Sequence, residues 1–243
     1  MHSICAEDYF FEKHMENALA AADKLLLEID MSDPMAMLSY QQQLMLPQGE
    51  SIRDYFQDED AYTRFGEFVK KNLGMDIAMM TQFKPFMFVS MLSMKAMQCS
   101  TQESYETNLM SKAKTQQKSI GGLETIKDQL DIFDQMSKSE LKQMLLQTME
   151  QMSETDTTLR TMTSLYKTQD VEALHRFIVS FEDMYSMESK LISSRNLRWM
   201  NQLQHDMPHE SLFIAVGAGH LGGEQGLIKL LRRGGYTVEP IVK

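Results

Sequence analysis

The sequence predicts a helix-rich α/β fold, in which a small and mostly parallel central sheet carries a large helical insertion. Apolar runs of strand length are few, and the long segments between them show the spacing of amphipathic helices. The end of the chain reads as strand, turn, helix and strand, an order that favours parallel pairing. We expect strands at about residues 24–29, 117–120, 211–217 and 236–241, and a strand end or turn in the first residues.

One domain is expected over residues 1–243, because 43% of the residues are hydrophobic and can bury a sizeable core. The core sheet is expected from about 1–30, 117–125 and 211–243, with helical insertions at about 33–115 and 126–206.

Capping residues mark the predicted helices. Asp8 and Asp58 are expected N-caps, Gly74 a C-cap, and Ser137 with Glu140 a capping box. The expected helices span about 8–22, 33–45, 51–56, 58–73, 81–98, 104–115, 137–152, 157–166, 170–185 and 187–204.

The composition excludes two classes of protein. A net charge of −10 with scattered Lys and Arg argues against a nucleic-acid-binding protein, which needs positive charge to neutralise phosphates. No apolar run approaches about 18 residues, so we expect no transmembrane span. Acidic and aromatic residues follow Met1–Cys5 at once, so we expect no signal peptide in this chain.

Cys5 and Cys99 are the two cysteines, and free buried thiols are the expectation; one bridge in an exported form is the alternative. The 23 methionines fall mostly at core spacing on helices, so this Met-rich composition is interpreted as core. A Met-rich surface for a partner or a metal is the alternative.

Carboxylates follow two of the predicted strands. Glu28 and Asp30 end the strand near residue 29, where they share one face at the edge at which ligands collect in parallel sheets. Glu124 follows the glycine turn Gly121-Gly122 at the start of a helix. The residues alone leave open whether these acids are solvated or capping groups or belong to a site.

Arg195-Asn196 lies on a long helix, and an arginine there is either a solvated charge or a bidentate partner of carboxylates. His220 follows a buried strand in a glycine-rich turn with Gly217 and Gly219. It either caps that turn or faces a site. Surface or boundary positions are expected for the other internal histidines, His14, His175, His205 and His209.

These motifs, in this order, resemble the TraB/GumN family, which includes the TIKI-type metalloproteases. The resemblance rests on Gly217-Ala218-Gly219-His220, on Arg195-Asn196, on Gly122-Leu123-Glu124-Thr125 and on the acid Glu28. It covers nearly the whole chain and implies an erythromycin esterase/ChaN-like fold.

The chain departs from the family pattern at its start. The family carries a first Gly-x-x-His motif, of which only His2 is matched here. We therefore expect a truncated N-terminus, with the missing glycine, strand and export signal lying upstream. By resemblance the protein is exported, whether periplasmic, extracellular or membrane-tethered.

The resemblance implies a metal-dependent hydrolase, most simply a peptidase acting on a peptide or protein. His2, His220 and Glu28 would be metal ligands, with Mn, Co, Zn or Fe as the metal. Glu28 or Glu124 would act as catalytic base, and Arg195 and Asn196 would stabilise charge and orient groups. Two alternatives remain: a non-catalytic binding or regulatory protein on the same scaffold, and an inactive fragment.

Overall fold

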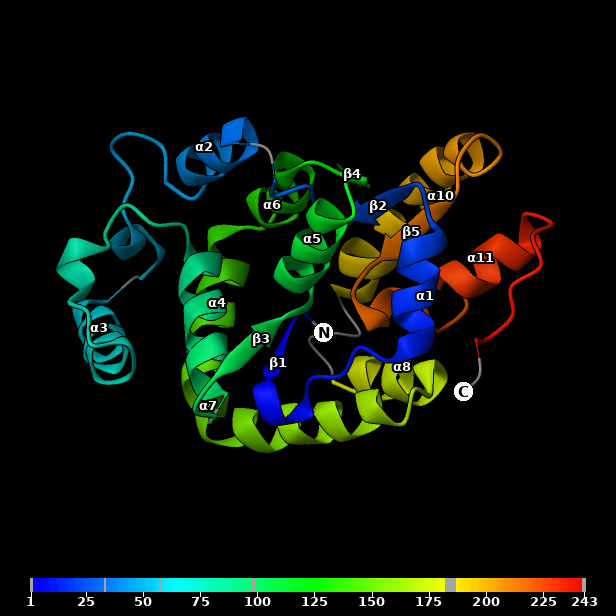
Figure 1. Ribbon diagram of the computed structural model, residues 1–243. Helices are drawn as coiled ribbons and strands as arrows, with labels where there is room; N and C mark the ends of the chain where they lie inside the picture. The colour runs from blue at the N-terminus through cyan, green and yellow to red at the C-terminus, as the bar shows by residue number, and fades with distance from the viewer. Residues whose placement is uncertain (1, 33, 57, 98, 182–186, 242–243) are drawn as a thin grey trace. The chain divides into compact units, whose positions relative to one another are not determined.

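The computed structural model describes residues 2–32, 34–56, 58–97, 99–181 and 187–241. It is 62% helical with a small three-stranded parallel sheet, which confirms the predicted helix-rich α/β fold class (Figure 1). The chain divides into two compact units. The first contains residues 1–32, 99–125 and 161–243, and the second contains 33–98 and 126–160. The single domain over 1–243 stays a prediction.

The sheet of the first unit has β2 (Lys24–Leu27) at its centre, between β4 (Ser119–Gly122) and β5 (Leu212–Ala215). All three strands are parallel, and Leu27 lies opposite Gly122 on one side and Ala215 on the other. The carboxyl ends of the three strands therefore meet at one edge of the sheet.

Helices bury both faces of the central strand. Leu26 packs with residues of α10 (Ser194–Asp206) and α11 (Leu227–Arg233), whereas Leu25 and Leu27 pack with α1 (Lys13–Ala21) and α5 (Tyr105–Thr115). All three leucines are at most 1% exposed. Burial on both sides explains why this strand reads as a continuous apolar run rather than an alternating one.

A separate antiparallel pair holds the start of the chain. β1 (Ser3–Cys5) pairs with β3 (Gln102–Ser104), a strand that the sequence did not predict because it is short and polar. The structure joins Cys5 to Cys99 in a disulfide, with their Cα atoms 5.7 Å apart. The expectation of free thiols was therefore wrong, because β1 pairing brings two sequence-distant cysteines together.

The second unit is built on helices around Phe65, Phe88 and Leu145, which are fully buried. Its elements are α2 (Pro34–Gln43), 3-10 turns Ile52–Tyr55 and Ile77–Met79, α3 (Glu59–Leu73), α4 (Pro85–Ala96), α6 (Ile126–Asp134) and α7 (Lys138–Lys167) as far as Arg160. Asp58 and Gly74 cap α3 as predicted.

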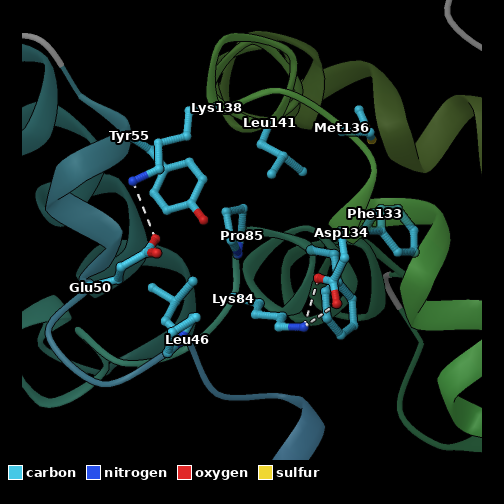
Figure 2. A pocket seen from close by; sticks show the side chains of 12 residues that line it. Leu46, Glu50, Tyr55, Lys84, Pro85, Phe133, Asp134, Met136, Lys138 and Leu141 are labelled. Atoms are coloured by element: carbon cyan, nitrogen blue, oxygen red, sulfur yellow. Dashed lines mark hydrogen bonds and ion pairs between the residues drawn. The ribbon is translucent and has the colours of Figure 1, made fainter.

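A cavity of about 300 Å³ lies within the second unit. Figure 2 shows two ion pairs among its lining residues, Lys84 with Asp134 at 2.6 Å and Lys138 with Glu50 at 3.2 Å. The Lys138 ammonium also lies over the ring of Tyr55. These charges are paired with one another, so the cavity presents no excess of either sign.

Several helix boundaries differ from prediction. Asp8 closes a 3-10 turn and pairs with Lys167, so the first helix begins at Lys13 with Glu12 as N-cap. The helices predicted at 137–152 and 157–166 are one helix, α7, because neither Gly nor Pro interrupts the intervening residues.

The predicted helix at 170–185 is shorter. α8 ends at Val179, and residues 182–186 lie outside the described part of the chain. The next helix carries a π-helical turn at Ser189–Ser193, after which α10 begins.

The predicted last strand is absent. Residues 236–241 pair with no strand of the described structure, and Ile241 is 62% exposed. The segment buries too little apolar surface to join the sheet, so the final element of the predicted strand–turn–helix–strand unit was wrong. Among the described helices, none combines the length and apolar character needed to cross a membrane.

The disulfide links positions 94 residues apart, so its loss should lower the free energy of unfolding by about 4 kcal/mol. Urea unfolding with and without reductant measures this. A Cys5→Ser/Cys99→Ser double variant is the matched control. It should unfold at the urea midpoint of the reduced wild type, and reductant should not change that midpoint. Equal midpoints for oxidised and reduced wild type would contradict the expectation.

Candidate functional site

The edge where the parallel strands end brings Glu28, Glu124 and Gly217 together. The backbone N–H of Gly217 donates to Glu28 Oε1 at 2.7 Å, and the N–H of Glu124 donates to the Glu28 carbonyl at 3.0 Å. A Cβ at Gly122 would lie 2.8 Å from the backbone nitrogen of Asp30. Glycine at this position therefore permits the close approach of two strand ends.

Arg195 binds both carboxylates from the start of α10. It donates through Nη2 to Glu28 Oε2 at 2.5 Å, through Nε to Glu124 Oε1 at 3.0 Å, and through Nη2 to Glu124 as well. Its Nη1 donates to the carbonyl of Leu191 at 2.9 Å and lies 3.1 Å from His220 Nε2. Burial alone lowers the pKa of Arg195, but the two carboxylates outweigh it and raise that pKa above its ordinary value.

Glu28 is a buried carboxylate that stays ionised. Burial is the largest single effect and raises its pKa, but the charges of His2, His220 and Arg195, with the Gly217 N–H, together lower the pKa of Glu28 to about 2. At neutral pH this carboxylate is an acceptor with a fixed negative charge.

His220 lies in a 3-10 turn, Ala218–His220, and is 6% exposed. Its Nδ1 lies 2.7 Å from Asn196 Oδ1, while Asn196 Nδ2 donates to the carbonyls of His220 and Gln225 at 3.1 and 2.7 Å. Asn196 Oδ1 can only accept, so His220 carries its proton on Nδ1 and presents the lone pair of Nε2. Burial lowers the pKa of His220 to about 4, which leaves the ring neutral at pH 7.

His2 reaches the site from the other end of the chain. Its Nδ1 hydrogen-bonds Glu106 in the first turn of α5, and its backbone carbonyl accepts from the N–H of Tyr105 at 3.1 Å. The hydrogen bond to Glu106 raises the pKa of His2, whose side chain is 62% exposed. His2 is thus anchored by α5 and by the β1–β3 pairing, although it lies next to the end of the chain.

The two histidines converge on one oxygen atom. Glu28 Oε1 lies 3.8 Å from His2 Nε2 and 3.9 Å from His220 Nε2. A Cβ at Gly217 would lie 3.2 Å from Glu28 Oε1 and 3.3 Å from His2 Nε2, so a larger residue there would crowd both side chains. One carboxylate, that of Glu28, and two imidazoles, those of His2 and His220, therefore lie close together beside Gly217.

The donor set suits a divalent cation chemically, because neutral imidazole and carboxylate are preferred ligands of Zn, Mn, Co and Fe. The spacing is wider than such a cation requires, since ligand atoms about 2.1 Å from a metal lie about 3.4 Å apart. Arg195 Nη1 also faces the lone pair of His220. Among the described residues, no group of three His, Cys, Asp or Glu side chains has metal-binding geometry.

Other predicted residues lie elsewhere. Asp30 Oδ1 accepts hydrogen bonds from the backbone N–H and the hydroxyl of Ser32. Gly121 lies within the sheet against Leu26, and a Cβ at Gly219 would meet the side chains of Ile178 and Ile192. Gly121 and Gly219 therefore serve packing.

The remaining internal histidines are not part of the cluster. His14 lies near Glu12, His175 packs against Gly223, and His205 pairs with Asp206. His209 lies against the carbonyl of His205.

Sequence reasoning missed two members of the site. Glu106 holds His2, and Trp199 donates through Nε1 to Glu124 Oε2 at 3.2 Å while its ring lies 4.4 Å from that of His220. An acid two residues after the N-cap Ser104 is an ordinary helix-start feature. Only the tertiary contact with His2 distinguishes Glu106 from other capping acids.

Replacing Arg195 with Met should lower the free energy of unfolding by about 3–5 kcal/mol, because Glu28 and Glu124 would remain buried without their shared cation. Arg198→Met is the matched control: Arg198 is 52% exposed and 3.8 Å from Glu124, so its loss should cost about 1 kcal/mol or less. Denaturant midpoints of the two variants decide; equal midpoints would refute a central role for Arg195.

Comparison with known proteins supports the relationship that the motifs imply. The model of the TraB/PrgY/gumN family matches residues 1–240. Metalloprotease TIKI1 of Danio rerio is 43% identical over 53 residues, which are 21% of this chain and 11% of that protein, so the chain spans only a small part of this relative. No solved structure matches the chain significantly. Because the family match extends over almost its whole length, the chain belongs to the TraB/PrgY/gumN family.

Proposed function

We propose that this protein is a metal-dependent hydrolase that cleaves peptide bonds, with His2, His220 and Glu28 as ligands of a divalent cation. One observation carries the proposal: the Nε2 atoms of both histidines face the same oxygen, Glu28 Oε1.

The surroundings of the histidines support this assignment. His2 Nδ1 is bound to Glu106 and His220 Nδ1 to Asn196, so each ring has an oxygen acceptor behind it. Metal-binding histidines are commonly held in this way, because the acceptor fixes the ring orientation and makes the ligand nitrogen more basic.

The comparisons support the reaction class. The TIKI1 relative is named a metalloprotease, which makes hydrolysis of a peptide or protein the first activity to test. The disulfide supports an exported location, because disulfides persist in oxidising compartments.

A divalent cation would supply an activated water molecule and polarise the scissile carbonyl. Arg195 would act as a positioning residue. Its Nε and Nη2 groups donate to Glu28 and Glu124, and one Nη1 N–H donates to the Leu191 carbonyl, so four of its five N–H groups already have partners. The fifth faces His220 Nε2 and would lose that acceptor when a cation binds there.

Glu124 is assigned the same positioning role. Its side chain is 3% exposed and its oxygens bind Arg195 and Trp199. Asn196 would orient His220. Glu28 is then the carboxylate that would face the cation and the water molecule that the cation activates.

The first test compares cation binding and peptide hydrolysis in wild type, His220→Gln and His205→Gln. Titration calorimetry with Mn²⁺ or Zn²⁺ should give about one equivalent for wild type, and a chelator should stop hydrolysis. His220→Gln should lose both properties. The exposed His205, which pairs with Asp206 and lies beside His209 outside the site, provides the control that should keep both.

Equal cation binding and equal hydrolysis in all three proteins would contradict the assignment of His220 as a ligand of the cation. Tight peptide binding without cation or hydrolysis would instead favour a non-catalytic binding protein.

Glu106→Gln should weaken cation binding about 10–100-fold, because His2 loses the charged acceptor behind its ring. Glu103→Gln is the control, since Glu103 lies on β3 and accepts from Asn108 rather than from His2. The affinities come from the same calorimetric titration. Identical affinities for both variants would show that Glu106 does not support a ligand.

A further inference from the structure

An apolar cavity of about 190 Å³ lies in the first unit, on the face of the sheet covered by α1 and α5. Its described lining comes from five separate segments that the fold brings together. The residues that determine its character are Phe11, Met15, Tyr105, Tyr166, Phe213 and Ala215.

Four lining residues belong to the candidate site or lie one or two positions from it in the chain. Leu27 and Val216 line it and directly precede Glu28 and Gly217. Ala218 lines it from the 3-10 turn that carries His220. Glu106, whose side chain binds His2, also lines the cavity. A substrate side chain held in the cavity would therefore extend from a backbone that lies near Glu28 and the two histidines.

Four of the described lining residues are aromatic: Phe11, Tyr105, Tyr166 and Phe213. Phe11 and Phe213 meet edge to face with centroids 6.4 Å apart, and Tyr105 and Tyr166 do so at 5.8 Å. Such rings favour further edge-to-face contacts with an aromatic guest.

The charge of the lining also favours an apolar guest over an acidic one. Glu106 is the single charged residue among the described lining residues, and its carboxylate binds His2 and Ser104. An acidic guest would be repelled by this negative charge, because no cation in the described lining compensates it. An apolar guest carries no charge that would have to be desolvated.

The size restricts the guest to a single side chain. Sites for whole small-molecule ligands usually measure about 300–1,000 Å³. A cavity of about 190 Å³ has room for one large apolar side chain.

We propose that this cavity is the specificity pocket of the enzyme and takes an aromatic or large aliphatic side chain next to the scissile peptide bond. The inference rests on the proposed function for the identity of the substrate. The geometry and chemistry of the pocket are independent of the metal.

The test uses peptides that differ at one position, occupied by Phe, Ala or Glu and scanned on both sides of the scissile bond. Both equilibrium binding and hydrolysis are measured. At the position that enters the pocket, Phe should be preferred over Ala by about 30-fold, and Glu should be the poorest.

Met15→Trp should fill the pocket and remove the preference for Phe. Met110→Trp is the matched control, because Met110 packs on the same core from α5 but does not line the cavity, and this variant should keep the preference. Met15→Ala enlarges the pocket and should shift the preference from Phe towards Trp, which provides the test if Met15→Trp fails to fold.

The outcomes separate the pocket from the reaction. Hydrolysis without preference for Phe at any position overturns the pocket and leaves the proposed function intact. A preference in binding that Met15→Trp abolishes, without any hydrolysis, supports the pocket and overturns the proposed function. An unchanged preference in both Met15 variants overturns the pocket.

Discussion

The ion pairs of Arg195 with Glu28 and Glu124 are the interaction on which the first unit depends. They join the end of β2, the loop after β4 and the start of α10, and all three side chains are at most 8% exposed. Three buried charges would be costly separately, but each is hydrogen-bonded to the others or to Gly217, Trp199 or Leu191. The same bonds fix the position of Glu28 Oε1, the atom that both histidines face. Stability and site geometry thus rest on one network.

Sequence reasoning located the three strands of the parallel sheet: the segments at 24–29, 117–120 and 211–217 appear as β2, β4 and β5. The signal is clearest for β2, because a parallel strand covered on both faces is apolar throughout. β4 and β5 are only partly buried. Sequence reasoning failed where the local sequence favours no particular element or boundary. β3 is three polar residues that become a strand only against β1, and residues 153–156 carry no breaker and so continue α7. The Cys5–Cys99 pairing also depends on β1 and β3, which no local pattern announces.

The candidate site shows the same division. Glu28, Glu124, Arg195, Asn196 and His220 follow strand ends or a helix start, and the structure brings them together with His2. Their catalytic and metal-binding roles remain proposals. Glu106 could not be found from the sequence, because its contact with His2 spans 104 positions and its local setting is that of any acid in a first helical turn.

The π-helical turn before Arg195 makes the site sensitive to the number of residues in this segment. The turn places one more residue than an α-helix would between Ser189 and Ser194, whose N–H donates to the Ser189 carbonyl. Losing one codon there would restore regular α-helix and rotate the preceding segment against α10 by about 100°. Leu191, whose carbonyl accepts from Arg195, would leave its place. Point substitutions preserve the residue count, so a one-residue deletion in this segment should disturb the contact of Arg195 with Leu191 more than a substitution of an exposed side chain there would.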